Sequence, residues 1–484
     1  MESPVERDAE SDDTAHPAAD GAPSASTVAV TDVRVDGTDL ECELAYGDDV
    51  APFFDAETFT ASYDVDVSSV PESILTIPVL AQVCPVAWAL GADVRAPTAD
   101  RQFLDSLATV GSVLAEMYPS FVEGGRVVVE RKGRGPRDDG GTASDRDGTR
   151  DGDGTRDVGD TRDGGGTALL FTGGINSLSA YVRHRAEDPT LIAVRSWHVG
   201  PSEDRRWQAW RGNVEEYADR FGVDARFVDS NTRDVLNSSL LSVQFADEYD
   251  GGWYSAVGEG LGLVGLTAPL AVAADVGTLY FGARHWEGFP TPDTLDHWEG
   301  RGMPWGSHPD IDEAVGWPGT RIVHDGYGST RQERVERVAD FVAAEHPDLP
   351  VWACEAPAGT RNCNQCEKCF RTAFALAVAG LDPNDHGLAL DAAAFEHARE
   401  RFEAREWLPD RHQAVFWREL QSAVGPETDL PVEGGEAFLE WLETADFDDV
   451  AGRSVRGRAV RAAARAVPLP VFTRMYDAYR SVRR

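Results

Sequence analysis

The sequence has almost no lysine. Its 484 residues carry 83 acidic side chains against 45 basic ones, which gives a formal net charge of −38. Only Lys132 and Lys368 are lysines, and arginine supplies the rest of the positive charge. This balance is typical of a protein dissolved in concentrated salt. It disfavours a broad nucleic-acid-binding surface, although a local basic patch remains compatible with it.

Long hydrophobic runs are also absent. Residues 74–92 are apolar but contain Pro78, Gln82 and Pro85, and residues 261–276 form a shorter run that includes Asp275. Because a membrane-spanning helix needs about 20 apolar residues, both runs are predicted to be buried core. The N-terminus is acidic and has no apolar signal core, so we expect a cytoplasmic protein.

Cysteine is scarce, and its distribution argues against a disulfide framework. Four of the six cysteines lie close together in the chain: Cys354, Cys363, Cys366 and Cys369. Thiolates in C-x-x-C turns suit the tetrahedral coordination of Zn²⁺, and four protein ligands leave no open position. The spacing therefore predicts a structural zinc site, with an iron–sulfur cluster as the alternative. Cys42 and Cys84 are expected to be ordinary core residues.

One stretch combines a strand, a glycine turn and a helix. Residues 167–171 are apolar and predict a buried strand, two adjacent glycines follow, and a helix is expected from Leu178 with Ser177 as its cap. A glycine turn lets backbone N–H groups face inward, and the start of a helix carries partial positive charge. The stretch therefore predicts an anion site, and phosphate is the usual occupant.

The turn resembles the pyrophosphate-binding loop of the PP-loop ATP pyrophosphatases, Ser-Gly-Gly-x-Asp-Ser; here it reads Thr-Gly-Gly-Ile-Asn-Ser. The resemblance implies that ATP is bound by backbone N–H groups and hydroxyls of Thr172, Gly173, Gly174 and Ser177. Asn176 replaces the aspartate of the family. It is expected to orient the pyrophosphate and to assist Mg²⁺ through water, and with Ser177 it is the catalytic candidate.

The loop and the cysteine cluster together resemble the 7-cyano-7-deazaguanine synthases of the queuosine and archaeosine pathways, over about residues 167–380. In that family four cysteines with this spacing form a zinc site, which implies the same role for the cysteines here. The resemblance also implies that ATP activates a carboxylate as an adenylate, that pyrophosphate leaves, and that ammonia or an amine attacks. A long tryptophan-rich insertion and an extra N-terminal region lead us to expect a different carboxylic acid substrate. The composition is similar to that of haloarchaeal proteins.

From residue 167 the sequence alternates strand and helix patterns, which predicts an α/β fold with a doubly wound parallel sheet of the HUP type. Polar residues at strand ends and in the insertion at 286–317 are candidate substrate contacts: Arg284, His285, Ser307, His308 and Asp325. The four tryptophans of that insertion could stack on a planar substrate or simply pack the loop.

The chain divides by composition into five parts. Residues 1–27 are predicted to be disordered, 28–132 a small α+β domain, 133–166 a flexible Asp/Gly/Arg linker, 167–380 the ATP-binding domain with the zinc site, and 381–484 a helical region. Residues 453–484 carry nine arginines against one acid. This tail could contact RNA, an anionic surface, a partner protein or the acidic chain itself. An RNA-modifying enzyme and a nucleotide-binding or scaffold protein without turnover are the alternative functions.

Overall fold

One sheet runs through the protein. The computed structural model describes residues 26–119, 124–133, 165–245, 252–291, 297–354, 361–425, 428–447 and 471. Within them, eleven strands lie in the order β10-β11-β9-β6-β7-β8-β3-β2-β1-β4-β5. Their bounds are β1 (Thr27–Asp36), β2 (Asp39–Tyr46), β3 (Thr58–Tyr63), β4 (Asp93–Asp100), β5 (Val127–Gly133), β6 (Gly166–Leu170), β7 (Thr190–Arg195), β8 (Ala225–Ser230), β9 (Val276–Gly282), β10 (Gly316–Trp317) and β11 (Thr320–Asp325).

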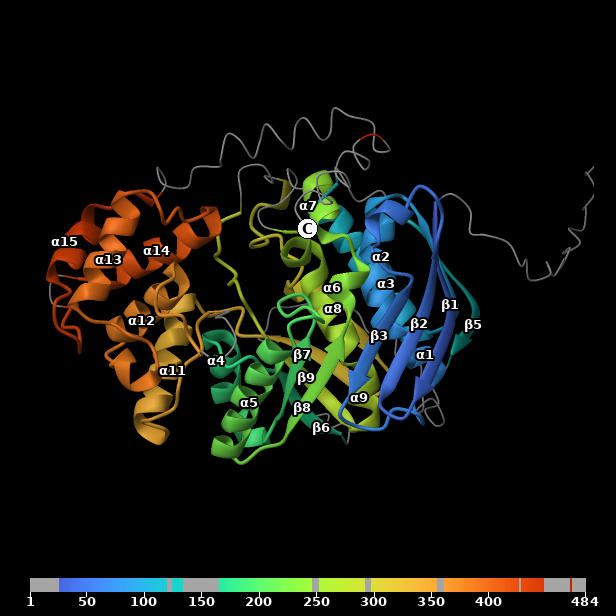
Figure 1. The fold of residues 1–484 in the computed structure, drawn as a ribbon, viewed down its shortest axis with the longest axis horizontal. Helices are drawn as coiled ribbons and strands as arrows, with labels where there is room; N and C mark the ends of the chain where they lie inside the picture. The colour runs from blue at the N-terminus through green and yellow to red at the C-terminus, as the bar shows by residue number, and fades with distance from the viewer. Residues whose placement is uncertain are drawn as a thin grey trace, which may run out of the picture.

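Helices cover both faces of this sheet, and most of them connect consecutive strands (Figure 1). Their bounds are α1 (Glu72–Leu75), α2 (Ile77–Ala89), α3 (Arg101–Met117), α4 (Ile175–His184), α5 (Asp204–Phe221), α6 (Thr232–Val235), α7 (Ser238–Phe245), α8 (Glu259–Leu266), α9 (Ala268–Ala273), α10 (Pro309–Asp312), α11 (Arg331–Glu345), α12 (Glu367–Val378), α13 (Ala392–Glu403), α14 (Arg411–Ala423) and α15 (Glu436–Thr444). The prediction of an α/β fold with a mostly parallel sheet is confirmed, whereas the HUP-type fold stays a prediction.

The strand order reverses between β6 and β9. From β6 the chain adds β7 and then β8 on one side, and later β9 and then β11 on the other side, all in parallel pairs. Connections that leave in opposite directions open a crevice at the carboxyl ends of the two central strands, which is where open α/β sheets bind ligands. The topology therefore points to the end of β6, where the glycine turn begins.

Residues 28–132 supply the other half of the same sheet. Strands β1, β2 and β3 pair antiparallel, β1, β4 and β5 pair parallel, and β3 pairs antiparallel with β8. The boundary predicted between the N-terminal and ATP-binding domains therefore falls within one hydrogen-bonded sheet. Strand β4 was not anticipated from the sequence. In Figure 1 these strands lie at one end of the molecule, opposite the C-terminal helices.

Two hydrophobic cores lie on the two faces of the sheet. One is formed with α1, α2, α3, α8 and α9, and the other with α4, α5 and α11–α15. Successive residues of β6 alternate between them, since Ala168 and Leu170 belong to the first core and Leu169 to the second. This alternation is the two-residue period of a strand that is buried on both faces.

Residues Tyr254–Ala273 form the one described helical run that is long and apolar enough to cross a membrane by length and composition. Burial inside the fold covers 78% of it, which accounts for its apolar side chains without a membrane. It overlaps the run that the sequence analysis assigned to the core.

The predicted terminal and linker features lie largely outside the described residues. This applies to the acidic N-terminus up to residue 25, to residues 134–164 of the linker, and to the arginine-rich tail apart from residue 471. The predictions about disorder, flexibility and contact with RNA or an anionic surface therefore stay predictions.

Asn231, which follows β8, forms side-chain hydrogen bonds with β3 and so links the two halves of the sheet. Its side-chain oxygen accepts a hydrogen bond from the N–H of Thr60 (2.8 Å), and its amide group donates to the carbonyl of Thr58 (2.9 Å). Asn231→Ala removes both bonds and should lower the free energy of unfolding by about 1–3 kcal/mol, measured by urea denaturation in concentrated salt. Ser112→Ala is the control, because the Ser112 hydroxyl bonds only to its own helix at Ala108. Equal stability of the two variants would contradict the assigned role.

Candidate functional site

Gly173 shapes the turn after β6. Its φ of 78° lies in the left-handed region, and a Cβ added there would lie 2.5 Å from Cε2 of Tyr217. The Tyr217 hydroxyl donates to the carbonyl of Gly173 (3.2 Å) and also bonds the carbonyl of Pro350. Both the backbone conformation and the close aromatic ring therefore require glycine at this position.

Helix α4 begins three residues earlier than predicted. Gly174 is its N-cap and no side chain caps it, so the prediction of Ser177 as the cap was wrong. The Ser177 hydroxyl instead lies inside the turn, where it donates to the carbonyl of Gly174 (3.0 Å) and accepts from the N–H of Thr172 (3.2 Å). The first turn of a helix has backbone N–H groups without intrahelical partners, and here no side chain occupies them. They are available to an anion.

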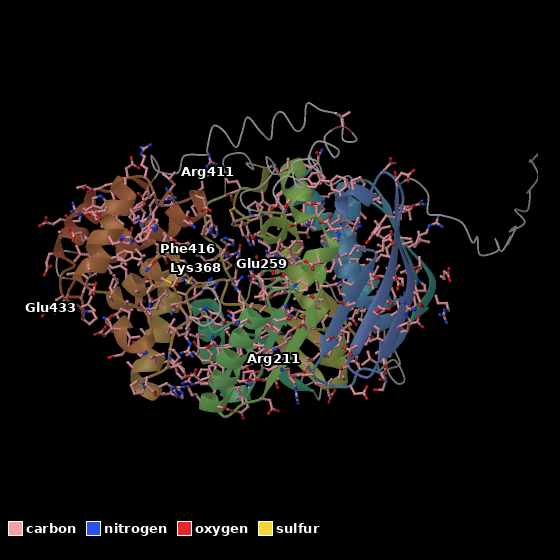
Figure 2. All side chains as sticks on the ribbon, in the orientation of Figure 1. Arg211, Glu259, Lys368, Arg411, Phe416 and Glu433 are labelled. Carbon is pink, nitrogen blue, oxygen red and sulfur yellow. The ribbon has the colours of Figure 1, made fainter. Side chains whose placement is uncertain are left out.

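A cavity of about 450 Å³ opens above this turn. The turn and the start of α4 line it, together with residues at the carboxyl ends of β6, β7 and β9. Helices α12 and α14 complete its wall. Glu259, Lys368 and Phe416, which all line the cavity, lie between the C-terminal and central helices in Figure 2. The cavity thus coincides with the crevice that the reversal of strand order creates.

Positive charge is concentrated in the cavity wall. The lining cations come from four different parts of the chain: Arg206, Arg284, Arg331, Lys368 and Arg371. Among the described residues, two carboxylates line the same space, Glu259 and Asp410. A protein of net charge −38 has therefore placed one of its two lysines and four arginines around one cavity. Such a local excess of cations attracts anions into a region of reduced dielectric, where the attraction is strong.

Arg331, at the start of α11, is the lining cation that contacts the glycine turn. Its Nη1 donates to Oδ1 of Asn176 (2.6 Å), and among the described residues it has no carboxylate partner. Burial, together with the nearby charges of Arg371 and Arg334, lowers the pKa of Arg331 to about 9. The guanidinium remains protonated at neutral pH and forms no direct ion pair among the described residues, although the charge of nearby Glu419 acts on it.

The predicted substrate contacts divide into two groups. Arg284 and Ser307 line the cavity, whereas His308 and Asp325 do not. His308 caps α10 by accepting from the N–H of Asp310 (3.1 Å). Asp325 is buried and is held by Arg183 at 3.0 Å. Both are therefore structural in this geometry, because their polar atoms are already used within the protein.

His285, the remaining candidate, lies behind the cavity wall. Its Nε2 meets Nε2 of His412 in α14, and the His412 ring stacks on Trp305. Burial lowers the pKa of both histidines well below the usual value. Two neutral imidazoles can share one N–H in this contact. His412 rather than His285 lines the cavity, so this pair joins the end of β9 to the C-terminal helices.

The tryptophans of the insertion serve different roles. Trp305 lines the cavity and donates its indole N–H to Glu259 at 2.7 Å. Trp298 and Trp317 are fully buried, and Trp286 packs against Phe289. Three of the four therefore pack the insertion, and one faces the site. Six further Phe, Tyr and Trp lining residues were not predicted as site residues and come from elsewhere in the chain: Phe171, Trp210, Tyr254, Phe281, Trp352 and Phe416.

The oxygen ligands of the cavity do not fit a protein-bound Mg²⁺. Magnesium takes carboxylate oxygens as its protein ligands. Glu259 is bound to the Trp305 indole and lies 3.6 Å from Nη1 of Arg284. Asp410 is the N-cap of α14. Asn176, from which assistance to Mg²⁺ was expected, directs its oxygen at Arg331. The described lining residues therefore present cations where a magnesium site presents anions.

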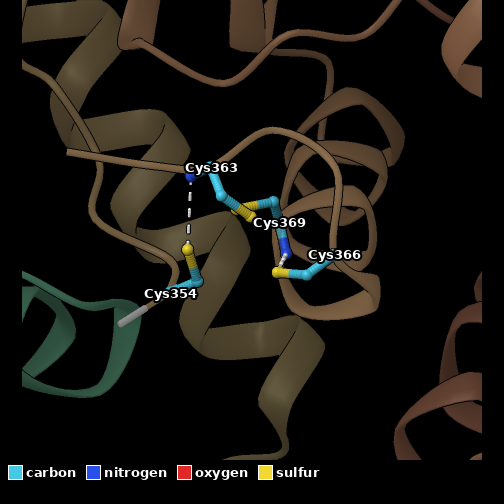
Figure 3. Close-up of side chains that lie close together, drawn as sticks. All are labelled: Cys354, Cys363, Cys366 and Cys369. Atoms are coloured by element: carbon cyan, nitrogen blue, oxygen red, sulfur yellow. Dashed lines mark hydrogen bonds between the residues drawn. The ribbon is translucent and has the colours of Figure 1, made fainter. Parts of the chain in front are cut away.

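The four clustered cysteines form a group that could hold a metal ion (Figure 3). Their sulfur atoms all lie within 4.8 Å of one another, and those of Cys363 and Cys369 are 3.8 Å apart. Four sulfurs at about 2.3 Å from one zinc ion lie about 3.8 Å apart, so the geometry fits tetrahedral zinc. Hydrogen bonds led by that from Cys369 lower the pKa of Cys366 to about 5, which favours a thiolate there.

The metal group and the cavity share one wall. Cys354 belongs to the group and also lines the cavity, beside Trp352. Cys366 caps α12 by accepting from the N–H of Cys369 (3.4 Å), and the first turns of α12 carry Lys368 and Arg371 into the cavity. The sequence analysis missed both residues. Lys368 could have been found from the sequence, because it is one of only two lysines in the chain and lies between Cys366 and Cys369.

Comparison of the chain with protein-family models, with curated proteins and with solved structures finds no significant match.

The turn itself can be tested with a matched pair of glycines. Gly222 also has a left-handed φ, of 70°, but an added Cβ there meets nothing within 4 Å. Alanine in the left-handed region loses about 1–2 kcal/mol, so Gly222→Ala should lower stability by that amount only. Gly173→Ala should lower it further, because the methyl group displaces Tyr217. Urea unfolding measures both, and equal losses would show that Tyr217 moves aside freely.

The metal group can be tested by elemental analysis. We expect about one zinc per chain in the purified protein, bound by four thiolates. Cys366→Ser should release the metal and lower the free energy of unfolding, because the cap of α12 loses its fixed position. Cys84→Ser, which changes a buried cysteine outside the group, should keep the metal. Iron with acid-labile sulfide in the wild-type protein would instead identify a cluster.

Proposed function

We propose that this chain is an ATP-dependent, adenylate-forming ligase that resembles the PP-loop enzymes. The observation that carries the proposal is the uncapped start of α4 below a cavity lined by five cations and two carboxylates. Backbone N–H groups at a helix start, a left-handed glycine turn and arginines from separate elements together suit the phosphates of a nucleotide.

The chemistry follows from the placement of charge. A carboxylate oxygen of the substrate attacks the α-phosphorus of ATP, the bond to the β-phosphate oxygen breaks, and pyrophosphate leaves as the acyl adenylate forms. Ammonia or an amine then attacks the acyl carbon, and AMP leaves with the electron pair of the cleaved C–O bond. The protein's part is to hold the two reactants in line and to stabilise the charge that develops on the leaving pyrophosphate.

Residues of the cavity divide between these tasks. Thr172, Gly174, Asn176 and Ser177 of the turn line the cavity together with Arg331, and this group suits the phosphates. Lys368 and Arg371 lie on α12 and suit the carboxylate of the substrate. The aromatic side chains of Trp210 and Trp305 offer faces on which a planar base can stack.

Zinc is the metal proposed for the four-cysteine group. With four thiolate ligands it has no position for a substrate, so its role is structural. It would fix Cys354 and the start of α12 relative to each other. Through them it would hold Trp352, Lys368 and Arg371 in the cavity wall.

A second candidate is a nucleotide-binding protein without turnover. It is favoured by Asn176, because the oxygen at this position is engaged by Arg331 rather than available to a metal. Both candidates require ATP to bind in the same cavity. They differ in whether pyrophosphate is released.

The test combines ATP binding with pyrophosphate release, measured in concentrated salt during incubation with small carboxylic acids. Binding with release is the expected result. Lys368→Met should weaken binding or slow release by about tenfold or more, the effect of losing a contact of about 1.4 kcal/mol. Lys132→Met is the matched control, because Lys132 belongs to β5, which lies at the far edge of the sheet.

The remaining outcomes separate the candidates. Binding without release for any acid would favour the protein without turnover. Failure of ATP to bind would show that the turn preserves a fold and no nucleotide site.

A further inference from the structure

We infer that the cavity binds a pyrophosphate group through arginine side chains, with Arg331 as the principal contact, and that no divalent cation held by protein ligands takes part. The inference rests on the proposed function, since it concerns the same anion site. In other phosphate sites, a metal ion held by carboxylates neutralises the phosphate charge. The inference assigns this task to Arg331, which no sequence motif marked as a site residue.

Asn176 makes this arrangement possible. A guanidinium has five N–H donors, and the structure uses Arg331 for one hydrogen bond, from Nη1 to the neutral oxygen of Asn176. The contact orients the guanidinium without cancelling its charge. An aspartate at the same position would form an ion pair with Arg331 and would reduce its attraction for a phosphate.

Arg334 provides an internal comparison. It also approaches Asn176 (3.4 Å), but it directs its other Nη bonds at backbone carbonyls of Ala283, Arg284, His285 and Gly326. Arg334 thereby ties the end of β9 to the loop after β11 and does not line the cavity. Arg331 lies one turn earlier on α11, lines the cavity and makes none of these backbone contacts. The two arginines therefore have separate roles, one structural and one facing the ligand.

The neighbouring charges support the same assignment. Arg284 and Arg371 lie close enough to contribute to the lowered pKa of Arg331, which shows that several positive charges converge on one region. Arg371 pairs with Glu367 at 2.6 Å, and Arg284 lies 3.6 Å from Glu259, so these two are partly neutralised. Arg331 forms no direct ion pair among the described residues, although the nearby charge of Glu419 offsets it in part. Entry of a polyanion would relieve the repulsion between the three arginines.

The two described carboxylates that could hold a divalent cation in the cavity already make other contacts. Glu259 accepts the indole N–H of Trp305, and Asp410 forms a capping box with Gln413. These contacts use Oε2 of Glu259 and Oδ1 of Asp410, and a metal ion at either oxygen would compete with them. Arginine also forms paired hydrogen bonds with phosphate oxygens, which gives the recognition a defined geometry.

The experiment measures equilibrium binding of inorganic pyrophosphate to the full-length protein in concentrated potassium chloride, once with excess EDTA and once with Mg²⁺. We expect the dissociation constants in the two conditions to agree within about threefold, which is less than 1 kcal/mol. Arg331→Gln should weaken binding by at least about tenfold in both conditions. Arg399→Gln, which removes a surface arginine paired with Glu403 on α13, is the control for loss of one positive charge.

A second variant tests the part played by Asn176. Asn176→Asp should weaken binding in EDTA by at least about tenfold, because the new carboxylate competes with pyrophosphate for Arg331. Asn213→Asp is the matched control, since Asn213 also accepts hydrogen bonds from an arginine, Arg361, but neither lines the cavity. Circular dichroism confirms that each variant is folded. The wild-type comparison of EDTA with Mg²⁺ requires no variant at all.

The pyrophosphate-binding results distinguish failure of this inference from failure of the proposed function. Binding that requires Mg²⁺ would overturn the inference and leave the anion site standing. Absence of binding in both conditions would also overturn the inference, and the separate measurement of ATP binding would then decide whether the proposed function stands. Unchanged binding by Asn176→Asp in EDTA would show that Arg331 is not the principal contact.

Discussion

The carbonyl oxygen of Gly173 is the contact on which the site depends. It accepts one hydrogen bond from the Tyr217 hydroxyl of α5 and another from the backbone N–H of Trp352 (3.1 Å). Three parts of the chain meet there: the turn after β6, the helix that follows β7, and the segment that leads into the cysteine group. The start of α4, which follows this turn directly, lines the cavity.

The second constraint is charge. The protein carries a large negative charge, yet the cavity collects arginines from α5, α11, α12 and the end of β9. Acidic side chains at the surface are surrounded by water and salt. Their electrostatic interactions are largely screened beyond a Debye length of about 10 Å or less, so they affect distant groups weakly. Charges inside the cavity, such as that of the buried Arg371, are screened less. The acidic surface and the basic cavity can therefore coexist, and the local excess of cations rather than the net charge decides what enters the site.

Local patterns predicted much of what is observed. The apolar run at 167–171 became β6, and the adjacent glycines became the turn before α4. The four cysteines came together as their spacing indicated. The predicted start of α4 was wrong because Ser177 is of a residue type that often caps helices. Its hydroxyl is instead used within the turn, and only the folded backbone reveals that choice.

What the sequence alone determined is what depends on neighbours within a few residues: strand and helix periods, the left-handed turn that Gly173 permits, and the chelating spacing of the cysteines. What only the tertiary structure decided is which distant residues meet. Arg331 is far from Asn176 in the chain, and His412 is far from His285; no periodicity couples them. The joining of residues 28–132 to the same sheet is equally invisible, because a strand's sequence does not specify its partner. Those contacts arise only when the whole chain packs. They place cations from separate elements around the glycine turn and so form the basic cavity.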